Sequence, residues 1–174
     1  MKSATIELIF RGFNAQNVRY IVAGGIAVVA HGYPRMTFDL DLIIQLKRDN
    51  ILKALAVLAD LGYRPMVPEQ PERFADEESR IAWIRDRGMK VFQMRSETHQ
   101  ETPIDIFVEE PFDFDAWHDR CPQETIADGV PFHFAAAGLL LDMKRKAHRE
   151  KDLGDIAFLE RVIAEERSGH AAGQ

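Results

Sequence analysis

The sequence predicts an α/β protein in which strands and helices alternate over residues 1–134 and helices alone follow over residues 135–174. The first observation behind this prediction is the order of the apolar patterns, which alternate between strand and helix periodicity in the first part only. The second is the length of 174 residues, which suits a single domain, or one domain with a small helical part appended. The third is a hydrophobic content of 46%, which is enough to bury a core.

The first elements surround a pair of glycines. Apolar residues at helical spacing predict an amphipathic helix over residues 4–17. A run of β-branched and aromatic residues predicts a strand over Arg19–Ala23, which Gly24-Gly25 ends. We expect a short buried helix over Ile26–His31 and a second strand over Phe38–Gln45.

The patterns that follow are weaker. Asp49-Asn50 offers an N-cap and Gly62 a C-cap for a helix whose apolar residues recur at helical period. Residues 63–67 are predicted as a short strand or a loop, and residues 72–87 as a partial helix that ends at Gly88.

Two segments of alternating hydrophobicity predict further strands over residues 89–95 and 102–108. The second of these strands would present Asp105 on the face opposite its isoleucines. Residues 111–121 are predicted as a loop or a short aromatic helix.

The end of the chain is predicted to be a hairpin followed by helices. Two short apolar runs over residues 125–134 flank Asp128-Gly129, a typical hairpin turn. From Ala135 onward we expect two helices broken near Glu150, and a frayed tail over residues 168–174.

Composition narrows the cellular setting and the partners. The single cysteine, Cys121, excludes an intramolecular disulfide and suits a reducing compartment, most simply the cytoplasm. No apolar run reaches the roughly 20 residues that span a bilayer, and residues 1–17 lack the layout of a signal peptide. The net charge of -6 argues against a general nucleic-acid binder, although five basic residues gather over residues 144–151.

Three aspartates, Asp39, Asp41 and Asp105, each interrupt an otherwise apolar predicted strand. Residues two apart on a strand point to the same face, so Asp39 and Asp41 would lie side by side and repel each other. Charged residues are rarely buried unless they are paired or bind a metal. Structural ion pairs would explain the three residues, and so would one or two magnesium ions. We favour magnesium, because hard cations prefer oxygen ligands.

The glycine pair indicates a phosphate-binding turn. Gly24-Gly25 at a strand-to-helix junction would let a phosphate approach the backbone closely, with the positive end of the next helix facing the anion. A glycine pair alone is common in α/β turns. Its combination with a short helix and an Asp-x-Asp strand is the more specific signal.

These motifs resemble those of the nucleotidyltransferase superfamily related to DNA polymerase β. The resemblance rests on Gly24-Gly25, on the segment Arg35-x-Thr37-x-Asp39-Leu40-Asp41 and on the strand that carries Asp105. It implies a nucleotidyltransferase fold with a mixed β-sheet flanked by helices. It covers about residues 19–45 and 102–160, whereas residues 62–101 carry no motif of the family.

The C-terminal motifs are similar to those of the small AbiEii-type, toxin-like nucleotidyltransferases. The segments concerned are Leu140-x-Asp142-Met143-Lys144 and Arg149-x-Lys151-Asp152-x-x-Asp155. The resemblance implies that the Lys-Asp-x-x-Asp helix has a partly structural role.

The resemblance also assigns roles at the core of the site. Gly24 and Gly25 would hold the nucleoside triphosphate, and Asp39 and Asp41 would bind magnesium. Asp105 would be the third metal ligand and a candidate base toward the acceptor hydroxyl. Many members of the superfamily have serine after the first glycine, so at Gly25 only backbone donors remain for the phosphate.

Four further residues are candidates for nucleotide binding. Arg35 is either a phosphate contact or an exposed turn residue, and Thr37 either a nucleotide contact or a residue that orders the turn. Lys144 matches a family lysine that contacts the phosphates. Lys151 would share a helix face with Lys144 if the helix between them were unbroken, and the two would then balance a triphosphate.

Together the motifs imply a magnesium-dependent nucleotidyltransferase with two ions, which moves a nucleoside monophosphate from an NTP to an acceptor hydroxyl and releases pyrophosphate. The acceptor would be a tRNA end, a protein side chain or a small molecule. The toxin-like resemblance adds an antitoxin protein as a partner. Two rival interpretations are a non-catalytic nucleotide- or partner-binding relative of the same fold and a metal-dependent nuclease.

Overall fold

The structure is a computed structural model that describes residues 3–127 and 129–171. Its main sheet has five strands in the order β1-β2-β5-β4-β3. β2 and β5 run parallel, and every other neighbouring pair is antiparallel, so the sheet is mixed as the resemblance implies. The five strands are β1 (Tyr20–Val22), β2 (Leu40–Ile44), β3 (Tyr63–Pro65), β4 (Val91–Ser96) and β5 (Ile104–Phe107).

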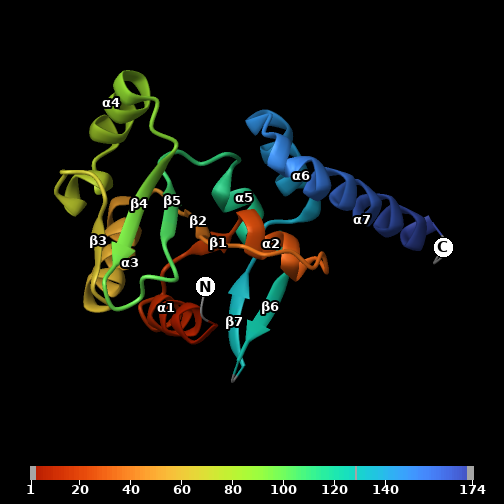
Figure 1. Cartoon of the computed structure of the whole chain (residues 1–174), viewed down its shortest axis with the longest axis horizontal. Helices are drawn as coiled ribbons and strands as arrows, with labels where there is room; N and C mark the ends of the chain where they lie inside the picture. Colours follow the sequence, from red (N-terminus) through yellow and green to blue (C-terminus); the bar gives the residue numbers. More distant parts are fainter. Residues whose placement is uncertain (1–2, 128, 172–174) are drawn as a thin grey trace.

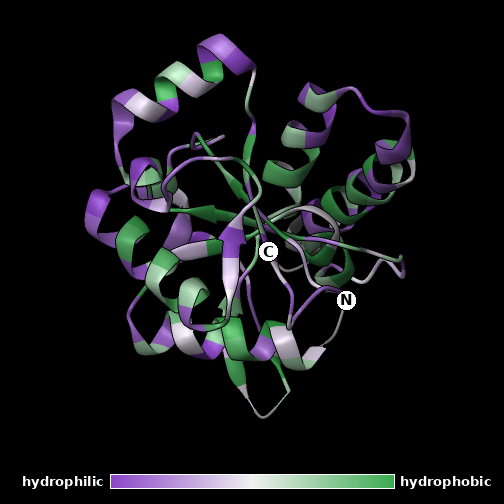
Figure 2. Ribbon diagram, turned by 60° about the vertical axis from the view of Figure 1, so that its left-hand side comes forward, coloured by the Kyte–Doolittle hydropathy of each residue, from purple (hydrophilic) through white to green (hydrophobic). Residues whose placement is uncertain are grey.

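Helices cover the apolar face of this sheet (Figure 1). They are α1 (Ser3–Ala15), α3 (Arg48–Asp60), the short 3₁₀ helix η1 (Pro71–Ala75) and α4 (Glu77–Arg87). Phe10 of α1 lies 5.4 Å from the ring of Tyr20 on β1. Phe74 and Trp83 stack on Phe92 of β4 at 4.8 and 5.7 Å. In Figure 2 the central strands are mostly hydrophobic, which matches this core.

The segment of the chain without a family motif therefore completes the sheet. It supplies strands β3 and β4 and the two helical segments between them. Gly62 and Gly88 both have positive φ, +78° and +59°, as their predicted places at helix ends require.

The second half of the chain adds short elements and a hairpin. α5 (Phe114–Trp117) and η2 (His118–Arg120) precede β6 (Gln123–Ile126) and β7 (Val130–His133). β6 and β7 pair antiparallel, which confirms the predicted hairpin, although Asp128 of its turn lies outside the described residues.

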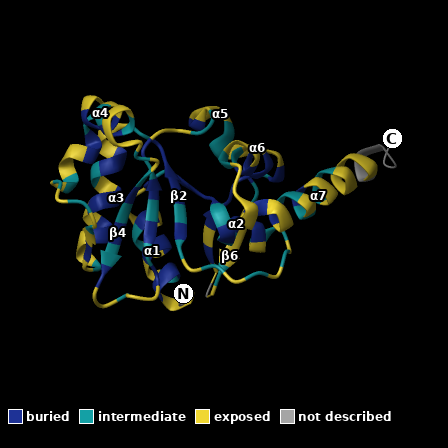
Figure 3. Cartoon of the chain, turned by 45° about the horizontal axis from the view of Figure 1, so that its top comes forward, coloured by how far each residue is buried: buried dark blue, intermediate teal, exposed yellow. Residues whose placement is uncertain are grey.

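The two predicted C-terminal helices are present and broken as expected. α6 (Ala137–Ala147) ends before His148, whose φ of +48° is left-handed, and α7 (Leu153–Ala171) follows the 3₁₀ helix η3 (Glu150–Asp152). Figures 1 and 3 show both helices on the side of the molecule away from α3 and α4, with the exposed end of α7 extending outward. Among the described residues, no helix combines the length and apolar character needed to cross a membrane.

Some expected boundaries were wrong. Asp39 lies just before β2 rather than within it, and α2 (Gly24–Ala30) begins at the glycine pair rather than after it. The predicted frayed tail is helical to Ala171, and residues 172–174 lie outside the description.

Asn50 does not cap α3, because Lys47 occupies that position. The Asn50 amide instead donates to the carbonyl oxygens of Arg19 and Gln45, and its side-chain oxygen accepts from the Arg19 N–H. Asn50 therefore ties the start of α3 to the ends of β1 and β2.

Candidate active site

The pairing of β2 with β5 brings the three predicted carboxylates together. Asp41 stands opposite Asp105 in the parallel register, and Asp39 directly precedes β2. Oxygen atoms from the three side chains all lie within 4.8 Å of one another. Asp105 lies 64 residues after Asp41 in the sequence, and only the crossover between the two strands makes it a neighbour of Asp39 and Asp41.

The cluster is electrostatically unsatisfied. Burial, followed by the charges of Asp39 and Asp105, raises the pKa of Asp41 to about 6, although Lys144 and Arg149 act in the opposite direction. Burial also raises the pKa of Asp105, against a hydrogen bond from Gln93. In both carboxyl groups, burial and like charges outweigh the neighbours that stabilise the negative charge.

A divalent cation is the group that these residues fit. Three carboxylates offer hard oxygen donors, and their separations allow one ion to contact all three. A bound cation would also offset the burial and the repulsion that raise the pKa of Asp41. Magnesium therefore agrees with the donor set on chemical grounds.

The glycine pair has a steric reason that the motif alone does not reveal. Gly24 has φ +57°, and a Cβ built there would lie 1.7 Å from Oδ2 of Asp41. A Cβ on Gly25 would lie 2.4 Å from Oγ1 of Thr37. Glycine at both positions lets the carboxylate of Asp41 and the hydroxyl of Thr37 lie directly against the first turn of α2.

Arg35 and Thr37 hold the segment that enters β2. The Thr37 hydroxyl donates to the carbonyl oxygen of Asp39 at 3.3 Å, so this residue orders the turn before the metal-binding candidates. The Arg35 guanidinium donates to the carboxylate of Asp155, which is 3% exposed at the start of α7. Arg35 is therefore an anchored side chain beside Gly25 and not a free turn residue.

Lys144 and Lys151 are separated by the break after α6, so the condition for a shared helix face is not met. Lys144 is buried and forms ion pairs with Asp152 at 2.9 Å and Asp155 at 2.8 Å. Lys151 is exposed on η3, and its charge lowers the pKa of Asp105.

Gln93 and Arg95 on β4 were missed by sequence reasoning. Gln93 pairs in register with Asp105 and donates to its carboxylate at 3.2 Å, and Arg95 lies 3.9 Å from the same oxygen. The alternation over the β4 segment places both side chains on one face. The sequence gives no sign, however, that this face meets Asp105.

A hollow of about 600 Å³ lies at the opposite end of α2 from the carboxylates. Its lining includes His31 after α2, Trp117 of α5 and Ile163 of α7. None of the three carboxylates contributes to it, so it is separate from the candidate site.

Comparison with solved structures identifies the fold. No known family model matches the chain, and no curated protein matches it in sequence. The lincosamide antibiotic adenylyltransferase LnuA, in a lincomycin-bound structure, matches with a TM-score of 0.62 at 16% identity, over 93% of this chain and 98% of the other. ANT(2")-Ia in complex with adenylyl-2"-tobramycin matches with a TM-score of 0.55 at 15% identity, over 97% and 98%.

A third match is an antigenic nucleotidyltransferase-like protein from Paracoccidioides brasiliensis, with a TM-score of 0.52 at 17% identity over 93% of this chain and 75% of the other. At these identities the comparisons establish the fold. The chain has the fold of the nucleotidyltransferases, as the sequence motifs implied, and the matches do not bear on a closer relation to the AbiEii-type branch.

Proposed function

We propose that this protein is a metal-dependent nucleotidyltransferase that moves a nucleoside monophosphate from an NTP to an acceptor hydroxyl and releases pyrophosphate. The observation that carries the proposal is the group of three carboxylates within 4.8 Å of one another, on a fold shared with adenylyltransferases. The raised pKa values of Asp41 and Asp105 support it, since these carboxylates gain most from a bound cation.

In this proposal Asp39, Asp41 and Asp105 hold magnesium, with two ions in the active state. Bound magnesium would polarise the α-phosphorus and stabilise the leaving pyrophosphate. Asp105 takes the proton from the acceptor hydroxyl, whose oxygen forms the new bond to phosphorus. Gln93 fixes the orientation of the Asp105 carboxylate through its 3.2 Å hydrogen bond. The backbone N–H groups at Gly24 and Gly25 would bind phosphate oxygens at the first turn of α2.

The two parts of the chain divide this work. Residues 1–134 carry the carboxylates and the glycine pair, and residues 135–174 supply cations beside them. The charges of Lys144 and Arg149 act on Asp41, and that of Lys151 on Asp105. We propose that residues 135–174 form a helical part whose task is to balance the nucleotide's charge.

For the acceptor, we place small molecules first. LnuA and ANT(2")-Ia were captured with lincomycin and with an adenylylated tobramycin, which supports a small hydroxyl compound here. The C-terminal motifs support a second candidate, a toxin of the AbiEii type that modifies a tRNA end or a protein and is restrained by an antitoxin. The lone, buried Cys121 suits action in the cytoplasm.

The test is to incubate the protein with each α-³²P-labelled NTP and magnesium, offering tRNA, total cellular protein, lincomycin and tobramycin as separate acceptors. We expect label on one acceptor class and stoichiometric pyrophosphate, both abolished by EDTA and by Asp39→Ala. Shortened nucleic acid in place of labelled product would indicate the nuclease. NTP binding without pyrophosphate release on any acceptor would favour the non-catalytic relative.

A further inference from the structure

Lys144, the lysine expected to contact phosphate, is enclosed by its own ion pairs. Its ammonium group lies 2.9 Å from Asp152 and 2.8 Å from Asp155, and all three residues are at most 5% exposed. A buried lysine between two buried carboxylates holds the connection between α6 and α7 together. Its charge is already balanced, and it has little surface left for a ligand.

Two arginines extend outward from the same aspartates. Arg35 pairs with Asp155, and its guanidinium carbon lies 3.6 Å from the position a Cβ would take on Gly25. Arg149 pairs with Asp152, Nε to Oδ2, at 2.6 Å. Asp155 therefore fixes Arg35 at the start of α2, and Asp152 fixes Arg149 at the break after α6.

Arg149 has the properties of a ligand-binding side chain that Lys144 lacks. Its side chain is 53% exposed, against 6% for Lys144. Among the described residues, the only hydrogen bond of the Arg149 side chain is donated by Nε, so its two terminal nitrogens have no protein partner there. The hydrogen bond to Asp152 raises the pKa of Arg149, and the charges of Asp152, Asp41 and Asp39 add to this effect.

A continuous set of contacts joins Arg149 to the glycine pair. Asp152 pairs with both Arg149 and Lys144, and Lys144 pairs in turn with Asp155. Asp155 holds Arg35, which lies beside Gly25.

We propose that Arg149, oriented by Asp152, is the side chain through which the C-terminal part binds the phosphates of the nucleotide, and that Lys144 only holds the ion cluster together. This inference rests on the proposed function. A guanidinium with two free nitrogens can donate two parallel hydrogen bonds to a phosphate, which an ammonium group cannot do with the same geometry. The aspartate on Nε fixes the direction in which those two donors point.

Arg149→Ala tests the inference, with Arg145→Ala as a matched control. Arg145 lies four residues earlier, is 55% exposed and pairs with Glu160 on α7. The measurement is calorimetric binding of Mg·ATP, Mg·GTP, Mg·CTP and Mg·UTP to the full chain. The NTP that binds best, and its monophosphate, are then carried into the variants. We expect Arg149→Ala to weaken NTP binding at least tenfold and monophosphate binding far less, and Arg145→Ala to change neither.

Arg149→Lys and Lys144→Met complete the test. Arg149→Lys should recover only part of the NTP affinity, since it keeps the charge and loses the two parallel donors. Lys144→Met should lower the melting temperature, while Arg149→Ala should melt close to wild type. If wild type binds an NTP and Arg149→Ala binds it equally well, the inference is overturned and the proposed function stands. If wild type binds none of the four, both are overturned.

Discussion

The carboxylates near the two ends of β2 have opposite electrostatic surroundings. At the start of the strand, Asp39, Asp41 and Asp105 lie together, and burial with the charges of neighbouring carboxylates raises the pKa of Asp41 and of Asp105. Beyond its other end, Asp115 of α5 accepts hydrogen bonds from three side chains and has a lowered pKa, owing first to Lys47. The two ends of β2 thus carry one acidic group that its neighbours compensate only in part and one that three side chains compensate.

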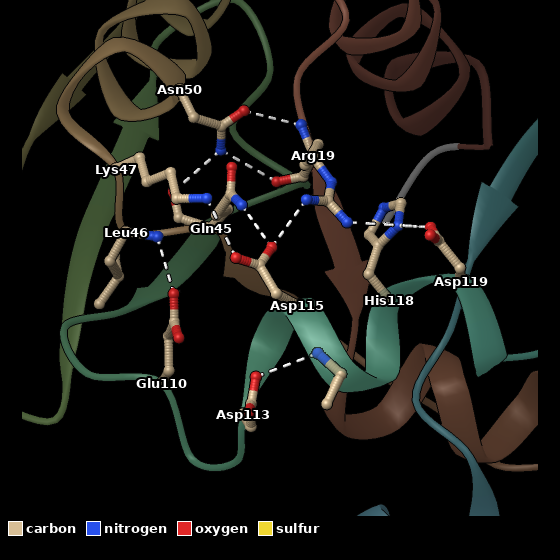
Figure 4. Close-up of polar contacts among 11 residues, drawn as sticks. Arg19, Gln45, Leu46, Lys47, Asn50, Glu110, Asp113, Asp115, His118 and Asp119 are labelled. Atoms are coloured by element: carbon tan, nitrogen blue, oxygen red, sulfur yellow. Dashed lines mark hydrogen bonds and ion pairs between the residues drawn. The ribbon is translucent and has the colours of Figure 1, made fainter.

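Figure 4 shows the compensated end. Arg19, which precedes β1, lies 2.7 Å from Asp115, and Lys47, which precedes α3, lies 3.0 Å away. The side-chain amide of Gln45, directly after β2, donates to the same carboxylate. Asp115 therefore links α5 to the residues that flank β1, β2 and α3, and its charge stabilises the fold.

The difference supports the proposal that the end of β2 with the three carboxylates binds a cation. A compensated carboxylate has its hydrogen-bond acceptors occupied by the protein. Ionised carboxylates at 4.8 Å or less that are only partly compensated lower the stability of the metal-free protein, and a proton or a bound cation relieves their repulsion. The following predictions test this contrast.

The largest effect is expected from exchanging single carboxylates at the two ends. Asp41→Asn should reduce nucleotidyl transfer on the order of a thousandfold or more, because it removes a proposed metal ligand and its charge. Asp115→Asn should leave the turnover rate near wild type and lower the melting temperature, because it weakens the contacts to Arg19 and Lys47. Steady-state rates well below both melting temperatures check this. Equal loss of activity in the two variants would remove the distinction between the ends.

A smaller effect is expected at the glycine that makes room for Asp41. Gly24 and Gly88 have nearly the same φ, +57° and +59°, but only Gly24 has side-chain atoms where a Cβ would go. Gly88→Ala should cost about 1–2 kcal/mol of unfolding free energy, the strain of a left-handed alanine. Gly24→Ala adds displacement of Asp41, and should cost about 3 kcal/mol or more and lose activity.

Urea unfolding of both variants measures these costs. Matching losses of stability, with activity kept in Gly24→Ala, would mean that the close approach of Asp41 to α2 has no part in the site.

Local patterns made most of the elements predictable. The hairpin, the break between the last two helices and the glycine ends at Gly62 and Gly88 follow from residues close in sequence. One boundary error has a local cause, because Gly24 can begin a helix at positive φ. The wrong N-cap has a tertiary cause, because the Asn50 side chain bonds to Arg19, 31 residues away, in preference to capping its own helix.

The candidate site could be predicted for residues that belong to a sequence motif. It could not be predicted for residues whose neighbours depend on how the strands pair. Asp39, Asp41 and Asp105 could be predicted because each interrupts an otherwise apolar predicted strand. Gln93 and Arg95 were missed because a polar residue on an alternating strand is ordinary, and its neighbour is decided by sheet order. The environment of Lys144 could not be predicted either, since its burial depends on how the chain turns after His148.

The smallest effect concerns the pH dependence of stability in the metal-free protein. The pKa of Asp41 in the folded state is about 6, above its unfolded value of about 3.9, so the folded state binds the proton more tightly. The stability this contributes is present below about pH 4 and is lost as the pH rises to about 6, by at most about 3 kcal/mol. The lowered pKa of Asp115 has the opposite sign, with stability lost as the pH falls below about 4.

Urea unfolding in EDTA between pH 4 and pH 7 distinguishes the contribution of Asp41 to stability from that of Asp115. Asp41→Asn cannot ionise at that position, so the variant should lose less stability than wild type between pH 4 and pH 6. At pH 7 magnesium should restore the unfolding free energy of the wild type and have little effect on that of Asp41→Asn. Cation binding to the folded state adds stability only where the site is intact. Asp115→Asn should keep both the wild-type loss over this range and the magnesium response. Parallel pH profiles for wild type and Asp41→Asn would show that the carboxylate cluster is balanced without a metal.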